Sequence, residues 1–376
     1  MGKVAGLTAM LLISLLVLAG CGSTATSNWT NTGGGLSKYS VMSFAYDSAH
    51  DVLYAGTASH GVWRCDSPRT SPRWTDMGGG VASYGIYALA YDPARDLVYA
   101  GGYKTDVGVN SVMGGVWRCT SPRASPRWID TGGSLGSFLV YALAYDAARD
   151  ILYAGTDRGI WRSLKPDGQP SWSGMGGGLK AFPVKSLAHD PTRNVLYAGG
   201  DNMVGGSGGV WYCNTPDGAP AWLSTTGDFN GTGVDALAYD SKRDILYAGT
   251  SGTGVRRCTS PRAAPSWTSM SEQLIKSGGP NAAVALAYDS AGDALFMGGY
   301  EAGGLVIRHD SGVWRCANPE QSDTWKPSGT GIRRFDISSM AFVPANGVMF
   351  AGVGPSQTLP IEGQGVWRYE LPPLKK

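Results

Sequence analysis

The sequence predicts an all-β protein, a single seven-bladed β-propeller whose blades are sheets of four antiparallel strands. Four short apolar and aromatic motifs recur in fixed order, seven times each, and strand-only units of about 50 residues match propeller blades. Gly supplies 56 of 376 residues while only 16% are charged, as expected of short strands joined by tight turns. The series also begins and ends within one blade, which is how a closed ring is built.

The first two motifs predict the inner hairpin of each blade. Ala-Leu-Ala-Tyr-Asp alternates as a half-buried strand does, and Leu-Tyr-Ala-Gly follows at a constant distance, as in the seven-residue step from Asp47 to Tyr54. The Asp is expected to accept backbone N–H bonds in the turn rather than to form a charged site. The first motif occupies residues 43–47, 88–92, 142–146, 186–190, 236–240, 285–289 and, in degenerate form, 339–343.

Gly-Val-Trp-Arg and a lone Trp predict the third and fourth strands. Nine residues separate Cys65 from Trp74, with Pro68 three places into the step, and five other blades repeat this spacing. Pro fixes φ in the turn, and the Trp that follows is expected to pack on a neighbouring sheet or blade. The Arg of the third motif is expected to form a structural pair at the blade edge. All 13 Trp of the chain belong to these two motifs, because Arg256 occupies the fourteenth place.

The two ends of the series predict how the ring closes. Trp29 is a fourth-strand Trp with no blade before it, and Trp367 lies in a third strand with no fourth strand after it. We expect the N-terminal outer strand to complete the last blade, so that no sheet edge stays open. The propeller then spans residues 29–371 and leaves residues 372–376 as a C-terminal tail.

The N-terminus predicts export and lipid anchoring. A basic residue and a short apolar run, too short to span a bilayer, are typical of a signal peptide. Leu-Ala-Gly-Cys at 18–21 resembles a bacterial lipobox. This resemblance implies removal of residues 1–20, acylation of Cys21 and a lipidated linker at residues 21–28. With Gly22 directly after Cys21, the chain resembles lipoproteins that are sent to the outer membrane. We therefore expect a bacterial cell-envelope protein, either periplasmic or surface-exposed.

Two hairpins between third and fourth strands resemble a known family. The segments Ser-Leu-Lys-Pro-Asp-Gly-Gln-Pro-Ser-Trp (163–172) and Cys-Asn-Thr-Pro-Asp-Gly-Ala-Pro-Ala-Trp (213–222) are similar to the Asp box of bacterial neuraminidase repeats, with an insertion. The chain thus resembles the sialidase-like and sortilin-like propellers, and the resemblance implies that the box is structural and far from the ligand face. The Arg-Ile/Leu-Pro signature of sialidases is absent, so the resemblance implies a fold more than an activity.

The loops between second and third strands predict where the protein binds. They vary in length from blade to blade, whereas both hairpins are constant. In up-and-down blades these loops share one face with the links between blades, which include an insertion near Glu272. One face is therefore uniform and the other decorated, and binding commonly resides in loops on a rigid scaffold. The candidate ligand-binding residues are Tyr103, Lys104, Asp106, Asn110, Asp201, Asn202, Tyr300, Glu301, Arg308, His309, Asp310, Gln357 and Glu362.

Composition limits the other functions. Lys plus Arg number 31 and Asp plus Glu number 29, which offers no basic surface for nucleic acid. Five Cys fall in third strands on separate sheets, too far apart for disulfides, so they are expected to be free thiols. Their spacing predicts no metal site, and no motif predicts a cofactor.

We expect a monomeric, non-catalytic propeller that binds an envelope protein or glycan through these loops and reaches the membrane through its anchor at Cys21. Two alternatives stay open. A carbohydrate-binding lectin predicts similar pockets between several blades. A sialidase-like glycoside hydrolase predicts facing carboxylates, for which Asp235 with Asp336, or Glu301 with Glu362, are candidates.

Overall fold

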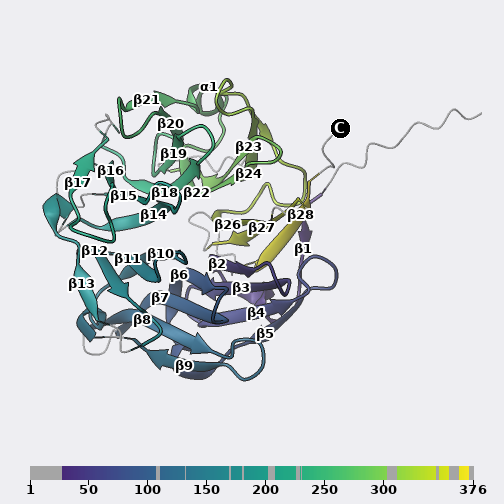
Figure 1. Ribbon diagram of the computed structural model, residues 1–376. Coiled ribbons are helices and arrows are strands. Elements are labelled where there is room, and N and C mark those ends of the chain that lie inside the picture. Colours follow the sequence, from purple (N-terminus) through teal and green to yellow (C-terminus); the bar gives the residue numbers. More distant parts are fainter. Residues whose placement is uncertain are drawn as a thin grey trace, which may run out of the picture.

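The computed structural model describes residues 28–106, 111–131, 133–168, 171–179, 182–201, 208–225, 229, 231–302, 311–343, 347–354 and 364–371. Within them lie seven sheets of four strands, arranged in a ring (Figure 1). Neighbouring strands within each sheet are antiparallel. The predicted all-β, seven-bladed propeller is confirmed.

Each blade begins with its inner strand and steps outward. Blade one comprises β2 (Val41–Asp47), β3 (Val52–Thr57), β4 (Val62–Asp66) and β5 (Arg73–Asp76). Blade two comprises β6 (Gly85–Asp92), β7 (Leu97–Asp106), β8 (Ser111–Thr120) and β9 (Arg127–Asp130). Blade three comprises β10 (Val140–Asp146), β11 (Ile151–Thr156), β12 (Gly159–Leu164) and β13 (Trp172–Gly174). Blades four and five comprise β14 (Val184–Asp190), β15 (Val195–Gly200), β16 (Gly209–Cys213), β17 (Trp222–Ser224); β18 (Val234–Asp240), β19 (Ile245–Thr250), β20 (Val255–Thr259), β21 (Ser266–Ser269). Blades six and seven comprise β22 (Ala282–Asp289), β23 (Ala294–Tyr300), β24 (Gly312–Ala317), β25 (Trp325–Pro327); β26 (Ile337–Val343), β27 (Val348–Val353), β28 (Val366–Glu370), β1 (Thr30–Asn31).

Short helices occupy the links between blades. Gly34 precedes the first of them with a φ of 73°, a left-handed conformation that Gly adopts without steric cost. The insertion expected near Glu272 forms the one α-helix of the described residues. The helices are η1 (Gly35–Lys38), η2 (Gly79–Val81), η3 (Gly133–Leu135), η4 (Gly177–Leu179) and α1 (Glu272–Lys276).

The two ends of the propeller meet in blade seven. β1 pairs with β28, with Thr30 opposite Arg368 and Asn31 opposite Trp367. Trp29 is buried, and its indole N–H donates to the carbonyl of Ser328 in blade six at 2.5 Å. The predicted closure of the ring by an N-terminal outer strand is confirmed.

The core lies between neighbouring blades. Each hydrophobic cluster joins side chains of adjacent sheets, as where Tyr54 and Val62 of blade one meet Val98 and Cys119 of blade two. A blade therefore completes its core only against its neighbours, as in other repeat architectures. The aromatic residues of the second strands, all fully buried, are Tyr54, Tyr99, Tyr153, Tyr197, Tyr247, Phe296 and Phe350.

The Arg of the third strand binds the outer hairpin of the next blade. Arg64 Nη1 donates to the carbonyls of Pro122 at 3.0 Å and Arg123 at 2.5 Å. In blade four Tyr212 takes the place of the Arg and donates its hydroxyl to the carbonyl of Arg262 at 3.1 Å. The expected structural role is confirmed, and it consists of joining blades. The equivalent contacts are Arg118 to Pro166, Arg162 to Pro216, Arg257 to Pro319 and Arg368 to Arg69.

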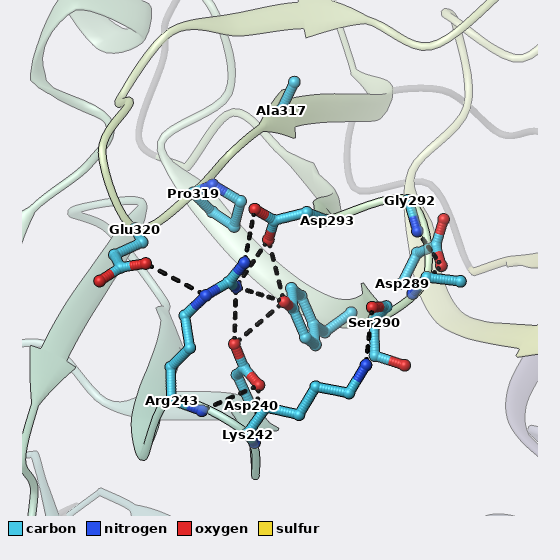
Figure 2. Close-up of polar contacts among 12 residues, drawn as sticks. Asp240, Lys242, Arg243, Asp289, Ser290, Gly292, Asp293, Ala317, Pro319 and Glu320 are labelled. Atoms are coloured by element: carbon cyan, nitrogen blue, oxygen red, sulfur yellow. Dashed lines mark hydrogen bonds and ion pairs between the residues drawn. The ribbon is translucent and has the colours of Figure 1, made fainter. Parts of the chain in front are cut away.

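The inner hairpins also tie blades together, as Figure 2 shows for blades five and six. Asp240 Oδ1 accepts the backbone N–H groups of Lys242 at 2.9 Å and Arg243 at 3.4 Å. The Arg243 guanidinium donates to Asp240 and to Asp293 of the next blade, each at 2.8 Å, and lies 3.1 Å from Glu320. The prediction that the motif Asp residues serve turns is confirmed.

The carboxylates of the two Asp-box-like segments belong to the same network. Asp167 lies 3.0 Å from Arg95 of the preceding blade, and Asp217 lies 3.5 Å from Arg149 of the preceding blade. Asn194 donates to Asp217 at 2.7 Å. These segments therefore hold blades together on the side of the rigid hairpins.

The five third-strand cysteines are free and buried, as predicted. Burial raises the pKa of Cys258 and that of Cys316 to about 11. No group of three or more His, Cys, Asp or Glu side chains among the described residues could hold a metal ion. In the same part of the chain, no helix is long and apolar enough to cross a membrane.

Candidate functional site at the mouth of the central channel

A β-bulge interrupts every inner strand near its start. In β2 the register slips between Val41 and Ser43, so that Met42 is the extra residue, and the other six inner strands slip at the equivalent place. Bulges re-aim side chains and are frequent at barrel rims and beside active sites. The seven bulged residues are Met42, Tyr87, Tyr141, Lys185, Asp235, Val284 and Ser338.

All seven bulged residues line one cavity of about 400 Å³ at the mouth of the central channel. Inner strands start at this end and second strands finish here, as Tyr300 at the end of β23 does. The loops of variable length leave from the same end, so the cavity opens on the decorated side. We call this side the loop face. The opposite side, which carries both rigid hairpins of every complete blade, is the hairpin face.

Blades four to seven supply a charged wall of the cavity. Lys185 Nζ lies 3.0 Å from Asp235 Oδ1 and 3.7 Å from Asp201 Oδ2. Burial alone would lower the pKa of Lys185, but the two carboxylates outweigh it and raise that pKa, so the ammonium stays protonated. Burial and the charge of Asp235 raise the pKa of Tyr300. Asp336 lines the same cavity.

Blades two and three supply an aromatic wall. The rings of Tyr87 and Tyr103 stack with centroids 4.7 Å apart and an interplanar angle of 7°. Tyr141 meets Tyr103 edge-on at 6.2 Å, which is a favoured aromatic geometry. Burial raises the pKa of Tyr141 to about 12. The three rings therefore form a continuous aromatic surface at the mouth.

The channel continues between the inner strands beyond the mouth. A second cavity of about 210 Å³ shares Met42, Tyr87 and Tyr141 with the first, so the two are continuous. Its wall holds the second residue of every first motif, a large apolar side chain in each blade. Ser43, Ser186 and Ser339 line it as well, and its exposed surface is more polar than apolar. The apolar residues are Phe44, Leu89, Leu143, Leu187, Leu237, Leu286 and Met340.

The structure brings some of the sequence-predicted residues together at this mouth. Tyr103, Asp201 and Tyr300 contact or line it. Lys104 is exposed and Glu301 is half-buried, and neither lines it. Asp106 ends β7, and its side chain is not among those described. Asn110, Asn202, Arg308, His309, Asp310, Gln357, Glu362 and the expected lipidation residue Cys21 lie outside the described residues.

Sequence reasoning missed most of the bulged residues. Tyr87, Tyr141 and Lys185 each stand immediately before the repeated first motif. The residue type at that position differs from blade to blade, whereas the residues of the motif that follows repeat. This difference could have identified the bulged residues from the sequence. Of the two carboxylate pairs considered for hydrolysis, Asp235 and Asp336 do line one cavity.

The comparisons with known proteins concern the fold. No family model matches the chain, and no curated protein matches it. The chain resembles the crystal structure of the RRP9 WD40 repeats with a TM-score of 0.64 and 12% sequence identity, over 92% of this chain and 98% of that chain. At such low identity the likeness shows the fold alone, a propeller of the kind that WD40 repeats form.

Proposed function

We propose that the protein is a non-catalytic, lipid-anchored scaffold of the bacterial cell envelope that binds a partner protein at its loop face. One observation carries the proposal. The seven bulged residues and the variable loops converge on that face, whereas the repeating Arg–Asp ion pairs between blades occupy the hairpin face. A rigid ring that varies on one side only is suited to recognition. A propeller fold like that of WD40 repeats is consistent with an interaction scaffold.

Strand directions support access to the loop face. β28 follows a loop between a second and a third strand, so it runs from the loop face to the hairpin face. In agreement with this direction, the backbone N–H of Leu371, just after β28, donates to the carbonyl of Gly347 in an inner hairpin at 2.7 Å. β1 is antiparallel to β28 and therefore starts at the hairpin face. An anchor at Cys21 would be followed by seven residues up to and including Asn28, which span at most about 25 Å. The hairpin face would then lie toward the membrane and the loop face away from it.

The chemistry of the mouth favours binding over catalysis. Lys185 is held protonated between carboxylates and so is a poor nucleophile or base. The described residues that line the cavity include no His or Cys. Tyrosine rings and hydrogen-bonding side chains are nevertheless also suited to a carbohydrate, which keeps a glycan ligand as the second candidate. A glycoside hydrolase would require Asp235 and Asp336 to act as a pair.

Site-specific photo-crosslinking in the native envelope tests the proposal. A photoreactive residue at Lys104, on the loop face, is expected to give a discrete protein adduct. The same residue at Thr70, exposed in an outer hairpin on the hairpin face, serves as the matched control and is expected to give none. Adducts only at Thr70 would contradict the proposal. Binding on a glycan array without any protein adduct would favour the second candidate, and glycoside cleavage abolished by Asp235→Asn would favour the hydrolase.

A further inference from the structure

One inner strand departs from the repeat at the junction between blades three and four. The first motif ends in Tyr-Asp in five blades, whereas β14 of blade four ends in His189 and Asp190. At the junction between blades five and six, the Tyr288 hydroxyl lies 3.0 Å from Asp240 Oδ2 of the preceding blade and 2.9 Å from Asp293 Oδ1 of its own blade. Tyrosine stays neutral at physiological pH, whereas an imidazole can gain a proton below about pH 6.5. In blade four the bridging tyrosine is therefore replaced by a group that can become charged.

His189 is enclosed between the two blades, and its Nε2 atom forms no hydrogen bond there. The side chain is 7% exposed, and Nε2 has no hydrogen-bond partner among the described residues. Asp146 Oδ2 of blade three lies 3.6 Å from Nε2, too far for a hydrogen bond. The Tyr153 ring of the same blade lies 5.7 Å from the imidazole, measured between centroids. The closed junction thus gives a protonated Nε2 no acceptor at hydrogen-bonding distance.

The charged groups around His189 already have partners. Asp146 Oδ1 accepts two backbone N–H groups, and its Oδ2 accepts a hydrogen bond from Arg149 Nη1 at 3.1 Å. Among the described residues, three carboxylates and three guanidinium groups surround the junction, namely those of Asp146, Asp190, Asp217, Arg149, Arg162 and Arg193. An imidazolium ion would add an unmatched charge in a place that water hardly reaches. Burial therefore lowers the pKa of His189, even though the charge of Asp146 acts in the opposite direction.

We propose that the junction between blades three and four opens in mild acid, when His189 takes up a proton. The open state accepts that proton below about pH 6.5, whereas the closed state resists it. The stability of the closed junction is therefore complete above that pH and is lost as the pH falls below it. Asp217 keeps its charge over this range, because a hydrogen bond from Asn194 lowers its pKa. β14 also carries Lys185, so opening would reach the mouth as well, whether or not the mouth binds a partner.

Two native cysteines report on neighbouring junctions. Cys213 is paired across its sheet with Trp222, which packs on side chains of blade three, and directly opposite residues of a sheet share one face. Cys213 therefore faces the junction that contains His189. Cys258 faces the junction between blades four and five, where Tyr239 takes the place of His189. Both thiols are buried, so a reagent reaches either of them only when its junction opens.

Thiol labelling of the full chain in non-ionic detergent tests the proposal. The reagent is dithiodipyridine, which also reacts in acid, and mass spectrometry gives separate labelling rates for Cys213 and Cys258. Their ratio cancels the pH dependence of the reagent itself. Between about pH 7.5 and about pH 5.5, the rate at Cys213 relative to that at Cys258 is expected to rise by up to about tenfold, the limit for one group with an ordinary pKa of about 6.5. A ratio that does not change with pH would overturn the proposal.

Two substitutions restore the residue of the repeat and form a matched pair. His189→Tyr is expected to keep the ratio constant between the two pH values. His50→Arg removes another histidine from an inner hairpin, one that contacts Asp47 and is 45% exposed, and is expected to leave the acid response unchanged. His189→Phe, which copies Phe342 of blade seven, provides the same comparison if the tyrosine variant does not fold. An acid response that persists without His189 would refute its role and assign the opening to another group.

Discussion

At the scale of single residues, the repeated Arg of the third strand is explained by what lies in the next blade. Arg257 donates to the carbonyls of Pro319 at 2.6 Å and Glu320 at 2.5 Å. Arg315 occupies the same place in blade six, but blade seven is closed by the chain ends and has no outer hairpin to receive it. Its guanidinium lies over the Phe296 ring at 5.9 Å instead. The same residue type therefore contributes differently in two blades.

This difference can be measured with two matched substitutions. Arg257→Ala removes charge-assisted hydrogen bonds to two carbonyls and is expected to lower the free energy of unfolding by about 1.5–3 kcal/mol. Arg315→Ala loses only a partly exposed cation–π contact and is expected to cost about 0.5–1 kcal/mol. Urea unfolding of the two variants beside the parent chain gives both values. Equal losses in the free energy of unfolding would show that the hydrogen bonds of Arg257 to the next blade contribute no more stability than the cation–π contact of Arg315.

Acid sensitivity is also set at the scale of single residues. Burial alone would raise the pKa of Asp190, but hydrogen bonds from the side chain and backbone of Arg193 lower it below the ordinary value. A carboxyl whose pKa is lowered on folding stabilises the protein above its unfolded pKa, about 3.9. That stability is lost as the pH falls through the folded pKa. The free energy of unfolding is therefore expected to decline below about pH 4.

The Arg193→Gln variant isolates this effect. Without the guanidinium, the pKa of Asp190 returns toward its ordinary value, so the variant is expected to be less stable at neutral pH and to decline less in acid. Arg127→Gln, on the exposed edge strand β9, makes the same change at an exposed position and serves as the control. Urea unfolding at about pH 7 and about pH 3 compares the three proteins. A decline as steep in Arg193→Gln as in the parent would be evidence against this ion pair.

At the scale of elements, strand existence could be predicted from the sequence and the site largely could not. The first motif predicts each inner strand because the alternation of apolar residues is contained within the motif itself. The bulge that presents Lys185 to the mouth depends on pairing with the next strand, and register is a property of two strands together. The meeting of Lys185 with Asp201 and Asp235 likewise joins two blades. Such contacts follow from ring geometry, which no single repeat contains.

The element that closes the ring provides a further test. Trp29 stacks on Tyr369 with centroids 5.1 Å apart and is 3% exposed, so Trp29→Ala is expected to cost about 3–5 kcal/mol. It is also expected to free the outer edge of β28, because β1 pairs through only two residue pairs. Hydrogen exchange should then accelerate in Val366–Glu370. Trp222→Ala, at the equivalent place in blade four, should leave those amides protected. Equal protection of β28 in both variants would contradict this role for β1.

At the scale of the whole molecule, the two faces differ because the hairpins of one face hold blades together, whereas the loops of the other face vary from blade to blade. Contacts on the hairpin face, such as Arg243 with Asp293, repeat around the ring and hold blades together. The loop face lies outside this repeating network, so its loops and bulged residues are free to differ. A membrane anchor would have to leave the loop face accessible for that variation to serve binding. The orientation of the propeller on its proposed anchor is therefore the property on which the proposed function depends.

Energy transfer to labelled lipid headgroups measures this orientation. Ser59 and Thr70 are exposed in one blade, Ser59 on the loop face and Thr70 on the hairpin face. Each is replaced by Cys in the protein that carries the proposed lipid at Cys21, bound to vesicles, and the five buried native thiols are expected to stay unlabelled. Because strands of about six residues separate the faces by roughly 20 Å, the label at Thr70 should transfer more energy than the label at Ser59. Cys21→Ser should abolish both signals. Stronger transfer from Ser59 would place the loop face against the membrane, where a large partner could not reach the mouth.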